Sequence, residues 1–373
     1  MDAMVFALDV CKEVKMPKIF SVPLNPFTTQ KYFEETFMPF LESYKEWIYD
    51  IYFTSRIEPF AQDAMGASIR EEDRDTLIQN ALFIKESLGI EISATFNNIN
   101  VSPKYENYRL FKKNFKDLYD TGVRSATVPH AHWVALGLKK EFPDLKIKNT
   151  ILRKVATAQD YVLAAEQGFD YINIDRVLMR DLESLKEIKR AQSYVKEKTG
   201  RHVPIALLTN EGCLGRCPMM DEHYSYNNLR TANDLPYFKH EISKVTCEYK
   251  WEKEINAFFF KAATIPPFKE EFDELLEYID VFKMHGRENV KKIYDSMSIV
   301  KNYAENNTML YDINLKISED SAAKWRKIIK TCQFECWSCN FCDRIAGGEL
   351  DYKAASVADI LVTSVNSDFE TTV

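Results

Sequence analysis

The sequence of 373 residues lacks the features of several large protein classes. No apolar run approaches the roughly 18 residues that a membrane span needs, and the start is too charged for a signal peptide. Basic residues are also outnumbered: the chain has 49 Lys and Arg against 56 Asp and Glu, which gives a net charge of −7. Because nucleic-acid-binding domains usually carry a basic surface, we do not expect nucleic acid as a partner. We expect a cytoplasmic protein without a membrane segment.

Motifs for nucleotide binding and for zinc-dependent proteolysis are missing as well. Neither G-x-G-x-x-G nor a Walker-type loop occurs, and the chain has only 11 glycines. No His-Glu-x-x-His occurs either, so the residues themselves give a hydrolytic peptidase no support. The chain does hold 46% hydrophobic and 13% aromatic residues, which is enough to bury a sizeable core.

Eight apolar, β-rich runs recur along the chain, and amphipathic stretches lie between them. The runs are Ile19–Leu24, Trp47–Phe53, Ile90–Phe96, Ser125–Val128, Ile147–Leu152, Tyr171–Ile174, Val203–Leu208 and Ile279–Met284. The clearest helical stretches are Glu72–Leu88, Arg109–Thr121, Ala158–Gln167 and Leu182–Lys198. Alternating strands and helices predict parallel βα units, and eight of them predict a TIM-type (β/α)8 barrel, an α/β fold, over residues 15–290.

The chain changes character after this predicted barrel. Residues 288–307 and 319–331 have helical patterns, a group of cysteines follows, and Asp351–Val373 has no strong strand signal. We therefore predict a helical, cysteine-rich extension over residues 291–373 that packs on the barrel. The run Ala257–Ala262 is a further candidate strand.

Six of the eight cysteines fall into two groups that are typical of metal ligands. Cys213 and Cys217 follow the seventh predicted strand, where functional residues of a barrel lie. The second group, which we call the ladder, consists of Cys332, Cys336, Cys339 and Cys342. Thiolates are the preferred ligands of zinc and iron–sulfur clusters. The alternative is that the cysteines form a disulfide scaffold. The size of the chain and its expected cytoplasmic location argue against this alternative.

The spacing of the cysteines within the ladder indicates which metal group they bind. The first three cysteines match the CxxxCxxC spacing of radical-SAM enzymes, but they come after the barrel and a fourth cysteine follows them. A four-cysteine zinc site is an alternative, although such sites more often use two separated pairs. Spacings of three, two and two resemble ferredoxin-type cluster binding. We expect a [4Fe–4S] cluster, with zinc as the alternative.

Polar side chains stand where several predicted strands end, so a barrel would bring them to one mouth. They are Asn97, Asn98, His130, His132, Asp175, Arg176, Asn210, Glu211, Lys283, His285 and Arg287. A pocket lined by Arg176, Arg180, Lys283 and Arg287 would suit a small anionic substrate, and the alternative is that such arginines form internal ion pairs. On a strand, His130 and His132 would face the same side and could share one ion. No carboxylate or third histidine accompanies them at a readable spacing, so we favour a structural role for this pair.

Three stretches in family order resemble the family named peptidase U32: Tyr171–Glu183, Asn210–Pro218 and Tyr278–Arg287. The resemblance implies a TIM-type barrel, and several members carry an oxygen-sensitive [4Fe–4S] cluster on four cysteines and take part in oxygen-independent hydroxylation. Typical members place two further cysteines upstream of the Cys-x3-Cys pair, whereas here no cysteine lies between Cys11 and Cys213. We expect the ladder to supply the missing ligands by folding over the barrel mouth. Either two of the six cysteines are spare or there are two metal sites.

The function predicted from this resemblance is a U32-like iron–sulfur enzyme. It would carry out oxygen-independent hydroxylation or related redox chemistry on a small anionic substrate. The candidate catalytic residues are Arg176, Lys283, Arg287 and His223, the last as a proton donor near the cluster. One alternative is a metal-stabilised barrel that binds a partner protein without catalysis. The other is a U32-type peptidase, which the family name alone suggests.

Overall fold

The structure is a computed structural model of the whole chain. It describes residues 18–26, 29–55, 57–60, 71–211, 260–262, 264–285, 290–311, 315–317, 319–336, 338–346 and 352–354. Cys213, Cys217, His223 and Arg287 lie outside these residues, as do Cys11 and Cys247.

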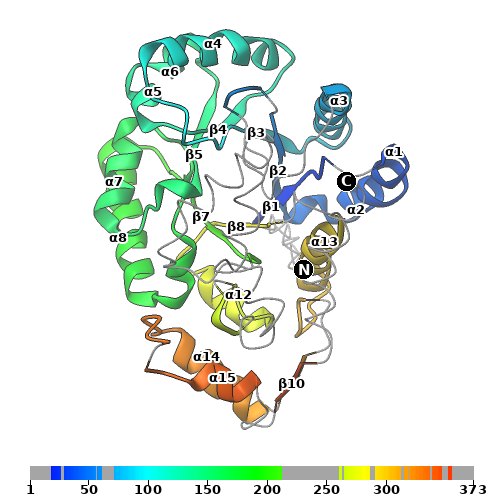
Figure 1. Cartoon of the computed structure of the whole chain (residues 1–373), viewed down its shortest axis with the longest axis vertical. Helices are drawn as coiled ribbons and strands as arrows, with labels where there is room; N and C mark the ends of the chain where they lie inside the picture. The colour runs from blue at the N-terminus through cyan, green and yellow to red at the C-terminus, as the bar shows by residue number, and fades with distance from the viewer. Residues whose placement is uncertain are drawn as a thin grey trace, which may run out of the picture.

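Eight parallel strands form one sheet that curls into a barrel (Figure 1). They are β1 (Phe20–Pro23), β2 (Ile48–Thr54), β3 (Glu91–Thr95), β4 (Ser125–Val128), β5 (Lys146–Asn149), β6 (Ile172–Asn173), β7 (Ile205–Leu208) and β8 (Val281–Lys283). Their order is β5-β4-β3-β2-β1-β8-β7-β6, and a parallel bridge between Lys148 and Tyr171 closes the ring between the two end strands. The predicted TIM-type barrel is therefore confirmed.

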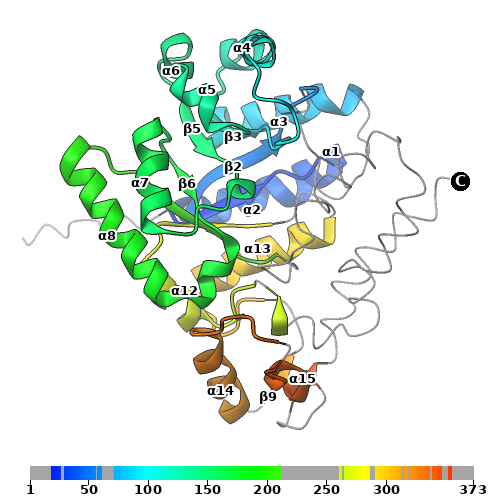
Figure 2. The same cartoon turned by 60° about the vertical axis from the view of Figure 1, so that its left-hand side comes forward.

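Helices surround the barrel and follow its strands in turn (Figures 1 and 2). The α-helices are α1 (Gln30–Tyr32), α2 (Met38–Tyr44), α3 (Glu71–Leu88), α4 (Tyr105–Asp120), α5 (Ala131–Ala135), α6 (Leu138–Glu141), α7 (Ala158–Gln167), α8 (Leu182–Thr199), α12 (Lys269–Leu275), α13 (Val290–Ala304), α14 (Glu319–Ile329) and α15 (Phe341–Ala346). The described residues also form the π-helix η1 (Phe33–Phe37) and the 3-10 helices η2 (Lys45–Trp47), η4 (Ile151–Arg153) and η5 (Arg176–Arg180).

Local signals explain why α7 has the bounds that the sequence predicts. The Thr157 side chain accepts the N–H of Asp160, and the Asp160 carboxylate accepts the N–H of Thr157, which makes a capping box. Gly168 ends the helix in the left-handed region, at a φ of 107°. A side chain at that position would be strained, so the glycine fixes where α7 stops.

The two faces of the sheet differ in chemistry. Aromatic rings fill the space between the sheet and α4 and α5: Phe96 and Phe111 have centroids 5.0 Å apart, as do Phe111 and Trp133. Inside the barrel, the carboxylate of Asp50 pairs with the ammonium of Lys148, and both side chains are at most 5% exposed. Ser21 donates to the same carboxylate at 2.5 Å. The barrel interior is thus held by a polar network as well as by apolar contacts.

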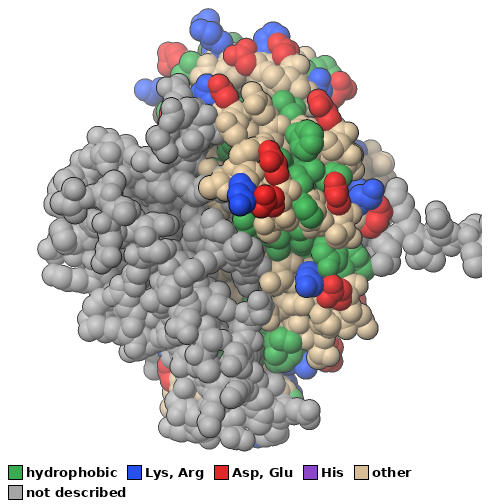
Figure 3. All heavy atoms as spheres, turned by 90° about the vertical axis from the view of Figure 1, so that its right-hand side faces the viewer, with side chains coloured by type: hydrophobic (Ala, Val, Ile, Leu, Met, Phe, Trp, Pro, Cys, Tyr) green, Lys and Arg blue, Asp and Glu red, His purple; other side chains and the backbone are tan. Residues whose placement is uncertain are grey.

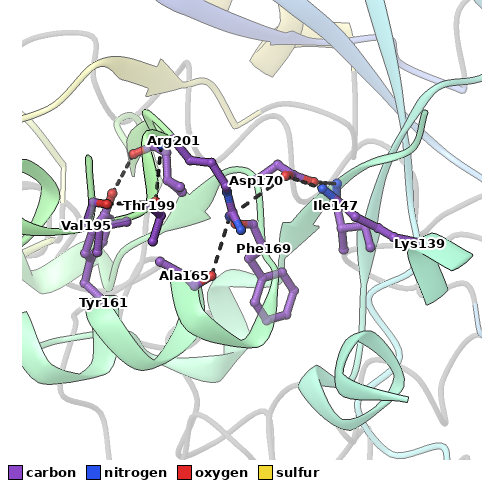
Figure 4. A network of polar contacts seen from close by, with 10 residues as sticks. Lys139, Ile147, Tyr161, Ala165, Phe169, Asp170, Val195, Thr199 and Arg201 are labelled. Carbon is purple, nitrogen blue, oxygen red and sulfur yellow. Dashed lines mark hydrogen bonds and ion pairs between the residues drawn. The ribbon is translucent and has the colours of Figure 1, made fainter. Parts of the chain in front are cut away.

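A second polar network reinforces the seam between β5 and β6 (Figure 4). Asp170 stands before β6; its backbone N–H donates to Ile147 O at 2.8 Å and its carboxylate accepts the Ile147 N–H at 2.9 Å. Lys139 pairs with the other carboxylate oxygen, and Arg201 donates to Phe169 O at 2.7 Å. The short strands β5 and β6 share few backbone hydrogen bonds. The Asp170 side chain therefore strengthens the junction between them.

The C-terminal elements lie beside α12, at the lower end of the molecule in Figures 1 and 2. Arg326 of α14 pairs with Glu271 and, at 2.7 Å, with Glu270, while Lys330 pairs with Glu274. The Trp325 ring meets Phe260 edge-on at 4.8 Å. The boundary predicted at residue 290 falls at the first residue of α13, which packs against α2 and β1.

Two short strands in this region have no counterpart in the sequence-based prediction. β9 (Leu315–Ile317) pairs antiparallel with β10 (Tyr352–Ala354). The candidate strand over Ala257–Ala262 is not seen in its described part, because Phe260 and Lys261 are helical. On the face in Figure 3, acidic and basic side chains of the described residues are interspersed. None of the described helices has the length and apolar character that crossing a membrane requires.

Candidate functional site

The ladder meets the barrel on loops that follow the carboxyl ends of its strands. Cys332 Sγ lies 3.9 Å from Nη1 of Arg180, which stands after β6 at the end of η5. Cys342 Sγ lies 3.5 Å from the carbonyl oxygen of Phe260, in the long connection from β7 to α12. Functional groups of βα barrels gather at this end of the strands. The ladder is therefore placed where the cysteines can take part in chemistry.

The backbone of the ladder turns sharply between its first and last cysteines. Phe334 has a φ of 59°, in the left-handed region, and its N–H donates to Cys332 Sγ at 3.4 Å. The carbonyl oxygen of Glu335 then accepts the N–H groups of Ser338 and Cys339, at 3.0 and 2.9 Å. These bonds fold the segment into a compact loop before α15 begins with Phe341.

The four ladder thiols are free of disulfides and influence one another. Burial and repulsion from the other three thiols raise the pKa of Cys342 to about 12, although Arg180 opposes the shift. Burial and the neighbouring Cys332 and Cys339 also raise the pKa of Cys336. A cation bound among the sulfurs would reverse this tendency, because thiolates are the metal-binding form.

Among the described residues, no three His, Cys, Asp or Glu side chains are arranged to hold a single metal ion. The ladder thiols are included in that statement. A single zinc ion needs all its ligands within about 2.3 Å of one point. A [4Fe–4S] cluster takes a wider set of sulfurs, because each cysteine binds a different iron.

The expected contact between the ladder and Cys213 and Cys217 stays a prediction, because both lie outside the described residues. The same holds for the roles of His223 and Arg287.

Arg176 and Glu211 form an ion pair at the barrel mouth. Arg176 comes from η5 after β6, Glu211 follows β7, and their side chains are 2% and 12% exposed. Asp175 next to them accepts the Val177 N–H at 3.1 Å and so starts η5. The pair joins two neighbouring strand ends, as expected of an internal ion pair.

Lys283, the last residue of β8, is 8% exposed. Its ammonium lies 4.7 Å from the centre of the Tyr52 ring, a distance at which cation–π attraction acts. The Tyr52 hydroxyl donates to the carbonyl oxygen of Met284. In the sheet, β1 lies between β8 and β2. Lys283 of β8 is therefore held in place by a ring from β2, two strands away.

Asn210 ties the ends of β7 and β8 together. Its side-chain oxygen accepts the His285 N–H at 2.6 Å, and its amide donates to His285 O at 3.1 Å. Asn98 is used in a similar way, since its amide donates to Pro59 O at 2.7 Å. Both asparagines hold the loops at the mouth in place.

His130 and His132 do not lie on a strand, because these residues begin helix α5. His130 is the N-cap residue and is buried, whereas His132 lies in the helix and is exposed. Arg153 donates to Nδ1 of His130 at 2.6 Å, so Nε2 must carry the proton that it shares with Val101 O at 2.6 Å. Both ring nitrogens of His130 are thus hydrogen-bonded, as expected for a structural role.

Sequence reasoning missed two features of this region. The carbonyl oxygens of Phe260 and Ala262 both accept hydrogen bonds from Arg180, and a backbone acceptor leaves no signal in the sequence. The pair of Asp50 and Lys148 also went unnoticed. Here a signal exists, because Asp50 and Lys148 interrupt strands that are otherwise rich in apolar residues.

Comparisons with known proteins agree with the resemblance that the motifs indicated. No protein-family model matches the chain. The uncharacterized protease MJ1657 of Methanocaldococcus jannaschii is 22% identical over 258 residues, which are 64% of this chain and 70% of that protein. The solved structure of the U32 peptidase Mk0906 is 14% identical, with a TM-score of 0.43, over 61% of this chain and 85% of that chain. A putatively assigned deoxyribose-phosphate aldolase from Coccidioides immitis is 8% identical, with a TM-score of 0.34, over 58% and 79% of the two chains. The chain thus resembles U32 proteins.

Proposed function

We propose that this chain is an iron–sulfur enzyme of the U32-like type, with a [4Fe–4S] cluster bound by its cysteines at the carboxyl end of the barrel. The observation that carries the proposal is that the first and last cysteines of the ladder contact one patch of the barrel, formed by Arg180 and Phe260. The candidate ligands are the four ladder cysteines together with Cys213 and Cys217.

The donor set favours a cluster. Soft thiolates suit iron–sulfur clusters and zinc, and they suit hard cations poorly. The spacings of three, two and two within the ladder, which resemble ferredoxin-type cluster binding, favour a cluster over zinc. When bound, such a cluster supplies one-electron redox chemistry.

We propose oxygen-independent hydroxylation, or related redox chemistry, of a small anionic substrate. Lys283 is a candidate for binding the anion, because its ammonium stands at the end of β8, where functional groups of βα barrels gather. Arg287 lies four residues further along the chain and would add a second cation. Arg176 would hold Glu211 at the mouth, and His223 would donate a proton.

The test is anaerobic purification of the whole chain with assays of iron, zinc and acid-labile sulfide. We expect about four irons and four sulfides per chain and the absorbance of a cluster. Cys342→Ser should lower the iron content, whereas Ser338→Ala, a change in the same loop, should not. Zinc in place of iron in the unchanged protein would rule out the redox function.

Two other functions have observations in their favour. The ladder joins the C-terminal extension to the barrel through Arg180, as a structural clamp in a partner-binding barrel would. In that case, cysteine substitutions would unfold the protein and remove no separable activity. A peptidase is suggested by the names of the similar proteins alone. Peptide hydrolysis that survives removal of all metal would support it.

A further inference from the structure

Arg153 stands at the rim of the barrel mouth, on the loop that follows β5. Its Nε donates to the carbonyl oxygen of Pro129 at 2.9 Å, and its Nη2 donates to Nδ1 of His130 at 2.6 Å. Pro129 and His130 follow β4, so the Arg153 side chain reaches from one strand end to the next. Nε2 of His130 in turn donates to the carbonyl oxygen of Val101, in the loop after β3. Three neighbouring loops therefore fix the orientation of the guanidinium.

The outer edge of the Arg153 guanidinium is open. A guanidinium carries its N–H donors in a rigid, planar fork. The edge formed by Nε and one N–H of Nη2 is taken up by Pro129 and His130. Nη1 and the other N–H of Nη2, on the outer edge, donate to none of the described residues, and Arg153 is exposed to solvent. The protein therefore holds one edge of the fork and presents the other.

No carboxylate of the described residues forms an ion pair with Arg153. In contrast, Arg176 at the same mouth pairs with Glu211. His130 adds no negative charge, because burial lowers its pKa and leaves the ring neutral. A carboxylate or a phosphate group accepts two parallel N–H bonds from such a fork, so the outer edge of Arg153 suits an oxyanion.

Buried polar atoms without partners lie below this rim, on the strands that flank β5. Thr127 of β4 pairs in register with Lys148, whose side chain points into the barrel, so Thr127 faces the same way. Asn173 of β6 comes two residues after Tyr171, the bridge partner of Lys148, and also faces inward. Both side chains are 1% exposed, and Thr127 Oγ1 and Asn173 Oδ1 make no hydrogen bond with the described residues. Since buried polar atoms are normally paired, the interior below Arg153 suits a ligand with hydroxyl or amino groups.

We propose that Arg153 binds an oxyanion of the substrate, a carboxylate or a phosphate group, at the rim of the barrel mouth. The inference rests on the proposed function in that the ligand is its small anionic substrate. Arg153 is a substrate-binding residue in this arrangement. His130 is a positioning residue, since it acts through Arg153.

The first experiment applies phenylglyoxal, which modifies accessible guanidinium groups, to the unchanged whole chain. Peptide mass spectrometry follows the rate at each arginine in the presence of acetate, methylphosphonate or acetamide, at equal ionic strength. We expect acetate or methylphosphonate to slow the modification of Arg153 severalfold, and the uncharged acetamide to leave it unchanged. Arg109, an exposed arginine of α4 that forms no ion pair with the described residues, is the matched control. Its rate should be the same in all three solutions.

The anion that protects Arg153 more strongly identifies the oxyanion of the substrate. Equal protection of Arg153 and Arg109, or no protection of Arg153 by either anion, would overturn the inference.

The second experiment measures the dissociation constants of acetate and methylphosphonate by saturation-transfer NMR of their methyl protons. Arg153→Met removes the fork and should weaken binding of the preferred anion about tenfold or more, as expected for the loss of hydrogen bonds between charged groups. Arg153→Lys keeps the charge without the fork and should lie between this variant and the unchanged protein. Arg109→Met should bind as the unchanged protein does. The same affinity in Arg153→Met and in the unchanged protein would contradict the role of Arg153.

Circular dichroism of each variant checks that the barrel is folded. If Arg153→Met does not fold, the protection of Arg153 in the unchanged protein and the affinity of Arg153→Lys decide together. Neither experiment depends on metal. Iron missing from the unchanged protein would therefore overturn the proposed function alone, whereas an unprotected Arg153 in a chain that holds iron would overturn only this inference.

Discussion

The barrel interior and the barrel surface beside the cysteine ladder both bury charged side chains, but only the interior charges form an ion pair among the described residues. Asp50 accepts from Ser21 and pairs with Lys148, whose ammonium also lies 4.4 Å from the centre of the Tyr171 ring. In the ladder, Arg180 has no carboxylate partner among the described residues, and Cys336 and Cys339 are exposed. A satisfied polar network is typical of structure, whereas an unbalanced one indicates where a ligand binds.

The comparison predicts that the interior controls the stability of the fold and that the ladder controls what the fold can bind. Substitutions in the two regions should therefore differ in kind. Those in the barrel should change the free energy of unfolding, and those in the ladder should change metal content first.

The largest effect is expected for Lys148→Met. This change leaves the Asp50 carboxylate buried without its cation, which should lower the free energy of unfolding by about 3–5 kcal/mol. Urea denaturation monitored by circular dichroism measures it. The double variant Asp50→Asn with Lys148→Met removes both charges and should regain part of that loss. A single variant as stable as the unchanged protein would show that the pair does not hold the interior.

Asp170→Ala should have the next largest effect. The change removes the acceptor for the Ile147 N–H and the partner of Lys139 at the seam between β5 and β6. A buried N–H left without a partner costs about 1–3 kcal/mol, and the same denaturation assay should show a loss in that range. Asp144→Ala, an exposed site two residues before β5, should change little. Equal losses from both variants would mean that the Asp170 network does not reinforce the seam.

Local signals explain how much of the fold could be predicted. The bounds of α7 follow from Thr157 and Gly168, and β4 coincides with its apolar run Ser125–Val128. The predicted strand at Ile147–Leu152 ends early, at Asn149, because Thr150 accepts the Leu152 N–H and starts a 3-10 turn. Apolar residues such as Ile151 fit either structure, so periodicity alone cannot choose.

Contacts between distant residues were harder to predict than elements. Asp50 and Lys148 are 98 residues apart, and Arg180 is 152 residues from Cys332. No local sequence pattern indicates that residues so far apart are partners. The ladder itself was visible, because four cysteines in a short stretch indicate metal chemistry wherever they fold. The position of the ladder on the barrel depends on the carbonyl oxygens of Phe260 and Ala262. Because every residue has a carbonyl oxygen, the sequence could not indicate this position.

Substitution of His130 tests whether a histidine with both ring nitrogens hydrogen-bonded contributes to the stability of the fold. Burial lowers its pKa below the ordinary 6.5, and the charges of Arg153 and His132 act in the same direction. Below pH 6.5 the unfolded chain takes up a proton that the folded chain refuses, so stability falls as pH decreases and is unaffected above that range. The slope is at most about 1.4 kcal/mol per pH unit. His130→Gln should flatten this part of the profile, measured by denaturation between pH 7 and 5; an unchanged slope would contradict it.

The smallest effect on the fold is expected from the ladder itself. In metal-free protein, Cys336→Ser or Cys339→Ser exchanges an exposed thiol for a hydroxyl and should change the free energy of unfolding by no more than about 0.5 kcal/mol. With metal bound, the two variants should differ from the unchanged protein far more, because metal binding adds its free energy to the folded loop. Limited proteolysis with and without iron separates the two cases: iron should protect residues 332–342 in the unchanged protein and in Ser338→Ala, but not in the cysteine variants. A cysteine variant that loses the barrel fold in the absence of metal would show instead that the ladder is a structural clamp, and the contrast between the two regions would no longer hold.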